Sequence, residues 1–155
     1  MKILWFTSAV AVGRSLALGI GRQRSRLPTK RMKCKVLLVD DELPILFAME
    51  RYLSANGFEV ETARELEEAQ ALLSNDVFDI VITDLHLTPI QKAEGLLVIE
   101  LVRSRGMASR VIVLTGHAAP EVEAAAYELG VDLFLWKPAS LPVLATTMRA
   151  LMAQA

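Results

Sequence analysis

Short apolar runs alternate with longer amphipathic segments from residue 35 to the end of the chain. The runs have four to six residues and are typical of buried strands. The segments between them repeat apolar residues three or four positions apart, which is typical of helices. The predicted strands cover 36–39, 58–62, 79–83, 110–115 and 131–136, and the predicted helices cover 44–57, 64–75, 95–106, 120–130 and 140–153. The pattern therefore predicts five strand–helix units in succession.

The first and last predicted helices carry end signals. Pro44 lies in the first turn of the first helix, where proline is tolerated, and Asn56-Gly57 predicts where that helix ends. In the last helix Ser140 is a candidate N-cap, and Pro142 is early enough to be accommodated. Local sequence alone thus places these helix limits.

Five units of this kind predict an α/β fold, a doubly wound five-stranded parallel sheet with helices on both faces. The continuous apolar strands agree with this fold, because central parallel strands are buried on both sides. In such open sheets ligands bind beyond the carboxyl ends of the strands, so the residues at those ends are the candidates for a site.

Charge divides the chain into a basic leader, residues 1–33, and an acidic domain, residues 34–155. The leader has eight basic residues and no acidic one, which leaves nine basic against 18 acidic residues in the domain. An acidic domain favours a cation over nucleic acid as its partner. The lone Cys34 excludes an intrachain disulfide and fits a reducing, cytoplasmic location.

The leader is apolar at residues 3–12 and again at 15–21, with Arg14 between the two runs. A membrane span needs about 20 apolar residues, and Arg14 interrupts one here. A peripheral membrane anchor and an export signal are the alternatives. Because Met32 directly precedes the first strand, we favour a disordered leader or an over-long gene start. No further domain is expected after the last helix.

Charged and hydroxyl side chains stand at the ends of four predicted strands. Asp40 and Asp41 follow the first strand, Asp84 follows the third, Thr115 ends the fourth and Lys137 follows the fifth. Three neighbouring carboxylates repel one another, so at least one should have a raised pKa unless a cation binds. Oxygen ligands without His or Cys suit Mg²⁺. The set predicts Mg²⁺-dependent phosphoryl transfer with an Asp as nucleophile.

Taken singly, these residues also have structural explanations. Asp40-Asp41 could be a turn at a strand end, Thr115 a β-branched strand residue and Lys137 a solvated side chain. A haloacid-dehalogenase type of phosphatase would need a second Asp where His86 stands. A dinucleotide site at 19–24 would need a third glycine and a preceding strand. The phosphoacceptor interpretation is preferred because all the residues fall on one rim.

Four motifs of the chain match a known family in order and in separation. They are VLLVDDE, VITDLHLTP, VIVLTGHA and FLWKP, and residues 35–153 as a whole resemble the receiver domain of two-component response regulators. The resemblance implies a flavodoxin-like fold with the strand order 2-1-3-4-5. With no domain expected after it, the chain resembles a stand-alone receiver.

The resemblance also implies a phosphoryl and metal site. Asp84 would be the phosphoacceptor. Asp41 would bind Mg²⁺ directly, Asp40 would act largely through water, and the backbone carbonyl of His86 would complete the metal ligands.

A further set of residues would bind and report the phosphoryl group. Lys137 would bind it, and the Lys137–Pro138 peptide would be cis. Thr115 would be the switch hydroxyl and Phe134 the switch aromatic. The surface of the fourth helix, fifth strand and fifth helix would present the change to a partner.

Two features depart from the family pattern. The loop after Asp84 is longer than usual, so that Pro89 and Gly95 come late. The two histidines, His86 and His117, each stand two residues after a site residue. They are either solvated loop residues or a shield that makes the lifetime of the acyl phosphate depend on pH between about 5 and 8.

The sequence thus predicts a signalling protein that is not a conventional enzyme. A histidine kinase or a histidine phosphotransfer protein would donate the phosphoryl group to Asp84, and an unknown protein would read the switched face. The alternative is a degenerate receiver that binds a partner without phosphorylation.

Overall fold

The computed structural model describes residues 33–87 and 93–154, so the predictions for the leader and for the loop at 88–92 lie outside the described residues. In chain order the elements are β1 (Lys35–Val39), α1 (Leu43–Ala55), β2 (Glu59–Ala63), α2 (Leu66–Asn75), β3 (Ile80–Thr83), α3 (Glu94–Ser104), β4 (Arg110–Thr115), α4 (Pro120–Glu128), β5 (Leu133–Trp136) and α5 (Leu141–Ala153).

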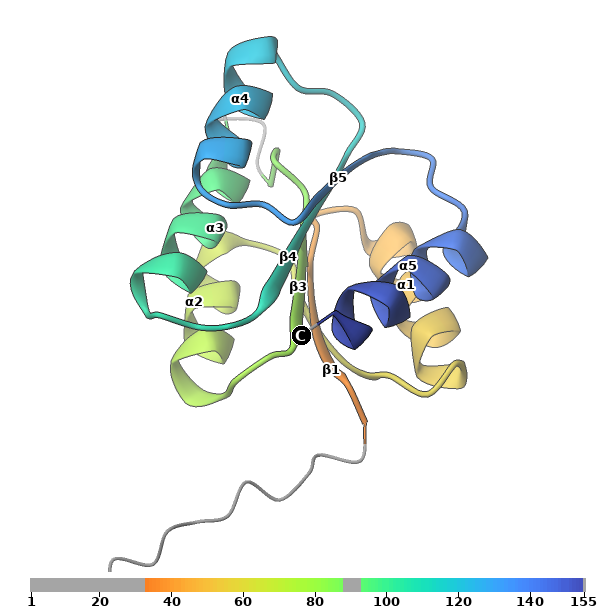
Figure 1. Ribbon diagram of the computed structural model, residues 1–155. Helices are drawn as coiled ribbons and strands as arrows, with labels where there is room; N and C mark the ends of the chain where they lie inside the picture. The colour runs from red at the N-terminus through yellow and green to blue at the C-terminus, as the bar shows by residue number, and fades with distance from the viewer. Residues whose placement is uncertain (1–32, 88–92, 155) are drawn as a thin grey trace, which may run out of the picture. The chain divides into compact units, whose positions relative to one another are not determined.

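The strands form one parallel sheet in the order β2-β1-β3-β4-β5. Helices α1 and α5 cover one face, and α2, α3 and α4 cover the other (Figure 1). The predicted doubly wound fold and its strand order are therefore confirmed. All carboxyl ends of the strands lie on one rim of the sheet, since every pairing is parallel.

The apolar strands supply two cores, one on each face of the sheet. Successive side chains of a strand point to opposite faces. Leu37 and Val39 of β1 accordingly join the core under α2, α3 and α4, while Val36 and Leu38 join the core under α1 and α5. All five residues of β1 are buried, as expected for a strand covered on both sides.

The helix limits lie within two residues of the predicted ones. Helix α1 has Pro44 in its first turn and is followed by Gly57, whose φ is +92°. Ser140 occupies the N-cap position of α5, as predicted, and its side chain makes no capping hydrogen bond. Helix α4 ends at Glu128, two residues earlier than predicted, where the chain turns through Gly130 at φ +84°.

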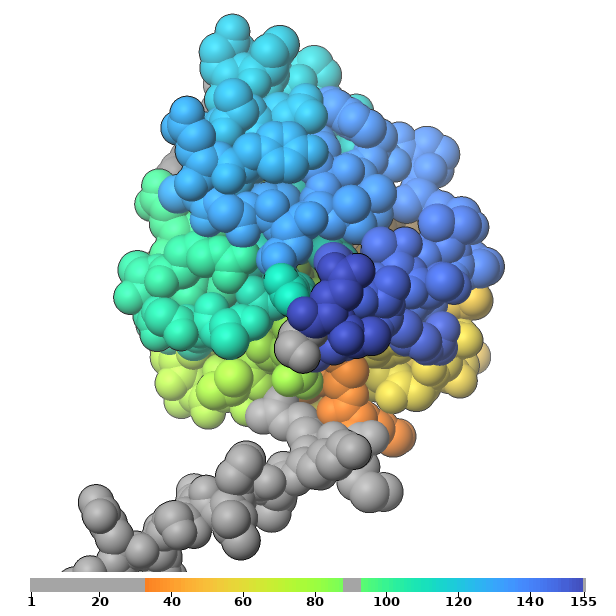
Figure 2. All heavy atoms as spheres, in the orientation of Figure 1, coloured from red at the N-terminus to blue at the C-terminus, as the bar shows by residue number. Residues whose placement is uncertain are grey.

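Helices α4 and α5 form much of the face seen in Figure 2. Tyr127 of α4, Trp136 of β5 and Val143 of α5 are exposed apolar side chains of these elements. Among the described residues, no helix combines the length and the apolar character that a bilayer crossing requires.

Candidate functional site

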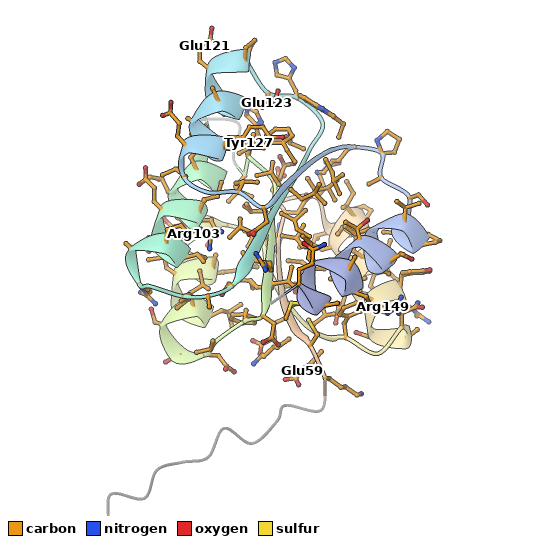
Figure 3. The ribbon with its side chains drawn as sticks, in the orientation of Figure 1. Glu59, Arg103, Glu121, Glu123, Tyr127 and Arg149 are labelled. Atoms are coloured by element: carbon orange, nitrogen blue, oxygen red, sulfur yellow. The ribbon has the colours of Figure 1, made fainter. Side chains whose placement is uncertain are left out.

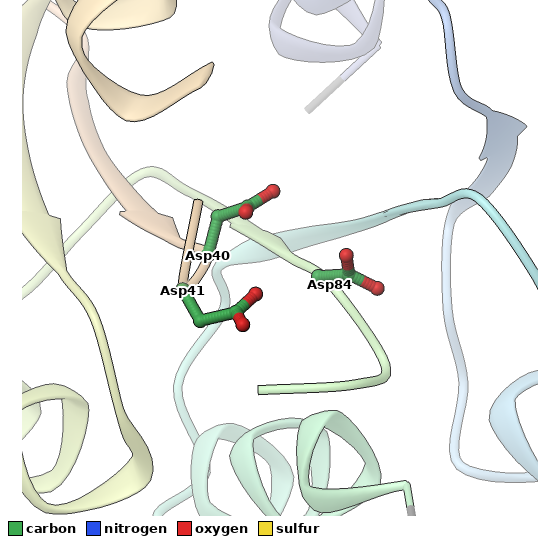
Figure 4. A group of neighbouring side chains, drawn as sticks. All are labelled: Asp40, Asp41 and Asp84. Carbon is green, nitrogen blue, oxygen red and sulfur yellow. The ribbon is translucent and has the colours of Figure 1, made fainter. Parts of the chain in front are cut away.

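Strands β1 and β3 bring three carboxylates together at the rim. Val39 pairs with Thr83, and the N–H of Asp84 donates a hydrogen bond of 2.9 Å to the Val39 carbonyl. Because the two strands end side by side, Asp40 and Asp41 come to lie beside Asp84. One carboxylate oxygen from each of these three lies within 4.8 Å of the others, and the three side chains turn toward a common space (Figure 4).

Asp40 is buried and both of its carboxylate oxygens have partners. Oδ1 accepts the backbone N–H of Glu42 at 2.9 Å, and Oδ2 lies 2.7 Å from Lys137 Nζ. Burial raises the pKa of Asp40, and this outweighs the lowering by Lys137 and by the Glu42 N–H. The neighbouring charge of Asp84 raises it further. The expectation of a raised carboxyl pKa is therefore confirmed, with burial as its main cause.

Asp41 differs from Asp40 in being exposed and in having no hydrogen bond or ion pair among the described residues. Its oxygens are free to take a ligand from solvent. An exposed carboxylate beside two buried ones, with no nitrogen or sulfur in the set, fits the oxygen preference of Mg²⁺. The donor chemistry of this rim therefore fits the predicted cation.

Asp84 is held by groups from three segments of the chain. Its Oδ1 accepts the Thr115 hydroxyl at 2.7 Å and the His86 backbone N–H at 3.2 Å. Its Oδ2 accepts a hydrogen bond of 2.7 Å from Lys137 Nζ. Only 7% of the Asp84 side chain is exposed, so its carboxylate is fixed in one orientation at the mouth of the site.

Lys137 is the cation of the rim. Its Nζ contacts carboxylate oxygens of Asp40, Asp84 and Glu42, the last at 3.0 Å. Burial alone would lower the pKa of Lys137, but the hydrogen bonds to the three carboxylates raise it well above its ordinary value. The Lys137–Pro138 peptide is cis, as expected. The ammonium is therefore permanently charged in any physiological medium.

The histidines stand over a cavity of about 280 Å³ at this rim. Their ring centroids are 6.2 Å apart, with His86 partly buried and His117 exposed. The Thr115 Oγ1 also lies 3.0 Å from the His117 carbonyl oxygen. The cavity is lined by Asp41, Glu42, Asp84, His86, Thr115, Gly116 and His117.

Phe134 lies away from the rim, on β5. It is 9% exposed and belongs to the core beneath α2, α3 and α4. Its ring centroid is 5.9 Å from that of Tyr127 and 5.3 Å from that of Trp136, and both of these neighbours are about half exposed. A movement of the Phe134 ring would therefore displace Tyr127 and Trp136, which lie at the surface of α4 and β5.

Two residues of the site did not emerge from sequence reasoning. Glu42 was overlooked as a partner of Lys137, although it is a third acid in the run DDE at a strand end. Gly95 was noted only for its late position. A Cβ there would lie 2.0 Å from the Asp84 backbone oxygen. The start of α3 therefore lies so close to the end of β3 that only glycine, which has no side chain, fits at position 95.

The site thus combines a fixed carboxylate, a lysine cation, a hydroxyl donor and an unpaired carboxylate whose oxygens suit a metal ion. Such a set suits phosphoryl transfer to a carboxylate, in which positioning and charge neutralisation supply most of the rate.

Comparison with known proteins agrees with this geometry. The family model of the response regulator receiver domain matches residues 36–149. The response regulator MprA of Mycolicibacterium vanbaalenii is 34% identical over 121 residues, which are 78% of this chain and 51% of that protein. This chain therefore spans about half the length of the curated relatives it matches.

Solved structures show the same fold. A CheY-like receiver domain protein of Methanospirillum hungatei superposes with a TM-score of 0.72 at 25% identity, covering 79% of this chain and 95% of that one. A response regulator protein of Burkholderia pseudomallei, described with a phosphorylated aspartic acid and a calcium ion, has a TM-score of 0.65 at 28% identity. The superposed region includes 79% of this chain and 74% of the Burkholderia chain.

Proposed function

The chain belongs to the family of response regulator receiver domains, and from this premise we propose that Asp84 accepts a phosphoryl group from a phosphohistidine. The donor would be a histidine kinase or a histidine phosphotransfer protein. The observation that carries the proposal is the Asp84 carboxylate, bound by Lys137 at 2.7 Å and by Thr115 at 2.7 Å beside two further carboxylates.

In the proposed step a carboxylate oxygen of Asp84 attacks the phosphorus of the phosphohistidine. A P–O bond forms and the P–N bond breaks, and its electron pair remains on the imidazole nitrogen of the donor. The product is an acyl phosphate on Asp84 and a free histidine. Lys137 and the Thr115 hydroxyl lie close enough to the carboxylate to bind the oxygens of the transferred group. Attack of water on phosphorus later restores the carboxylate.

The rim residues would hold Mg²⁺, with Asp41 as direct ligand, Asp84 beside it, Asp40 acting through water and the His86 backbone carbonyl completing the set. When bound, the cation would neutralise negative charge shared by the carboxylates and the phosphoryl oxygens. Support comes from the free carboxylate of Asp41 and from the phosphorylated aspartic acid and calcium ion described for the Burkholderia relative.

The switch would connect the rim to the surface of α4, β5 and α5. Thr115 ends β4 and Phe134 lies on the adjacent β5, where Val113 pairs with Phe134. A phosphoryl group on Asp84 would draw the Thr115 hydroxyl to itself, and Phe134 would shift with the neighbouring strand. The exposed Tyr127 and Trp136 would transmit this shift to a protein partner.

Intact mass of the full chain after incubation with acetyl phosphate and Mg²⁺ tests the proposal. We expect one added phosphoryl group in the wild type and none in Asp84→Asn or after chelation of the metal. A folded wild-type protein that gains no mass would contradict phosphorylation and would favour a binding module that works without it.

A further inference from the structure

The Lys137 ammonium has no N–H left free to donate a hydrogen bond to a phosphoryl group. An ammonium carries three N–H donors. Lys137 Nζ lies 2.7 Å from Asp40 Oδ2, 2.7 Å from Asp84 Oδ2 and 3.0 Å from Glu42 Oε1. Each donor is thus matched to one carboxylate before any phosphoryl group arrives.

A phosphoryl oxygen can gain a donor from Lys137 only if one of these carboxylates gives it up. The Asp40 side chain is 6% exposed, so releasing it would leave a buried charge without its counter-ion. The Asp84 side chain is 7% exposed and needs its contact with Lys137 until its own carboxylate has been phosphorylated. The Glu42 side chain is 56% exposed and makes the longest of the three contacts. Water can replace Lys137 at the Glu42 carboxylate at little cost, so this contact is the one that can open.

Glu42 is also placed where a donor must enter. It lines the rim cavity together with Asp84, and it lines a second cavity of about 550 Å³ between α1 and the segment after β5. Its backbone N–H is held by Asp40 at 2.9 Å, so the main chain is fixed while the side chain faces solvent. Its carboxylate therefore stands beside the acceptor, within reach of Lys137.

We propose that Glu42 is a positioning residue that holds Lys137 in the unphosphorylated protein and slows phosphorylation until its carboxylate is displaced. This inference rests on the proposed function, because it describes what limits the transfer to Asp84. After hydrolysis of the acyl phosphate, Glu42 recaptures Lys137 and the site returns to its starting state.

The initial rate of phosphorylation of the full chain by acetyl phosphate and Mg²⁺, followed by intact mass at several donor concentrations, tests the proposal. We expect Glu42→Gln to be phosphorylated about 2- to 5-fold faster, the range set by the strength of one exposed ion pair. The increase should persist at saturating donor, because it comes from a local contact with Lys137 and not from the encounter with the donor. It should shrink in high salt, because salt screens an exposed ion pair. Glu50→Gln, on α1, which Glu42 precedes as the N-cap residue, removes the same charge and should leave the rate unchanged.

Two further variants separate the contact from the charge. Glu42→Asp keeps the charge but shortens the side chain, and Asp at an N-cap position tends to bond to the helix N–H groups instead. It should therefore be accelerated like Glu42→Gln. In a Lys137→Ala background the Glu42→Gln substitution should have no effect on the residual rate, because the contact is already absent.

The outcomes distinguish the two proposals. A phosphorylated wild type with an unchanged or slower Glu42→Gln overturns the role of Glu42 and leaves Asp84 as acceptor. The same holds if Glu42→Asp behaves as wild type, or if the acceleration survives without Lys137. A folded wild type that takes up no phosphoryl group overturns both proposals.

Discussion

The Thr115 hydroxyl donates a hydrogen bond of 2.7 Å to Asp84 Oδ1, although the two residues are 31 positions apart, Asp84 following β3 and Thr115 ending β4. Both residues are buried, Thr115 completely. The parallel pairing of β3 with β4 brings their carboxyl ends together and so creates this contact. It connects Asp84, the proposed acceptor, to the strand next to β5.

Replacing Thr115 by Val should remove this hydrogen bond with almost no change in shape. Because the acceptor is a buried carboxylate, we expect the free energy of unfolding to fall by about 1–3 kcal/mol at neutral pH. Urea denaturation measures the change. Thr146→Val on the exposed side of α5 is the control and should stay within about 0.5 kcal/mol. A Thr115→Val protein as stable as wild type would mean that the contact contributes nothing to folding.

Gly95→Ala should be among the most destabilising single substitutions near the site. The added Cβ would meet the Asp84 backbone oxygen at 2.0 Å and the Leu85 Cα at 2.7 Å, and neither backbone atom can move without shifting β3. We expect a loss of about 3 kcal/mol or more.

The matched control for that substitution is Gly116→Ala, where a new Cβ has no neighbour within 4 Å. It should cost about 0.5 kcal/mol or less. Thermal or urea denaturation of both variants decides the point, and equal stabilities would show that α3 can retreat from β3.

Asp132 should make stability depend on pH at the opposite end of the sheet. Its carboxylate accepts the Val111 N–H at 2.7 Å and pairs with Arg110 at 2.9 Å and with Arg103 at 3.1 Å. Arg103 lies on α3 (Figure 3). Burial would raise the pKa of Asp132, but these partners together lower it below its ordinary value.

A lowered pKa in the folded state means that the carboxylate stabilises the fold fully above the unfolded pKa of about 3.9 and loses this effect as the pH falls through the folded value. Asp132→Asn should therefore cost about 1–3 kcal/mol at pH 7. The difference from wild type should shrink below pH 4, in a series of urea denaturations across that range. A difference that stays constant with pH would assign the loss to packing.

Mg²⁺ binding should depend most on Asp41. Isothermal titration calorimetry of the full chain should give an affinity for Mg²⁺ at least about tenfold weaker in Asp41→Asn than in the wild type. Loss of a residue that only supports a metal ligand typically weakens metal binding by this much, and loss of a direct ligand should weaken it no less. Glu123→Gln on α4 removes an equal charge from outside the rim and should bind like wild type (Figure 3). If both variants bind equally well, the cation does not use the Asp41 carboxylate.

The His86 and His117 rings should slow the loss of the phosphoryl group. Standing 6.2 Å apart beside the Asp84 cavity, they would limit the paths by which water reaches the phosphorus of a phosphorylated Asp84. After removal of the donor, His86→Ala and His117→Ala should lose the added mass faster than wild type. The same assay between pH 5 and 8 tests the predicted pH dependence, and wild-type rates throughout would leave the rings without a role in lifetime.

The sequence by itself determined the elements of the fold and most of the rim. Apolar runs of strand length and helical spacing depend on neighbours in the chain, so they predicted the sheet, its two-sided burial and the strand ends that carry Asp40, Asp41, Asp84, Thr115 and Lys137. Family motifs then supplied the strand order, which local periodicity does not contain. The end of α1 was also predictable, because Gly57 can take a positive φ without the steric cost that a side chain would add.

Only the tertiary structure decided how the rim groups pair. Glu42 and Lys137 are 95 positions apart, and their contact exists because β5 ends across the rim from the start of α1. The close approach at Gly95 likewise depends on how α3 packs against β3. Asp40 is buried and Asp41 is exposed, although the two are neighbours in the chain. Burial raises the pKa of Asp40, while the exposed carboxylate of Asp41 has no partner among the described residues. Local pattern cannot encode these relationships, because distances between distant residues and shielding from solvent arise only when the layers assemble.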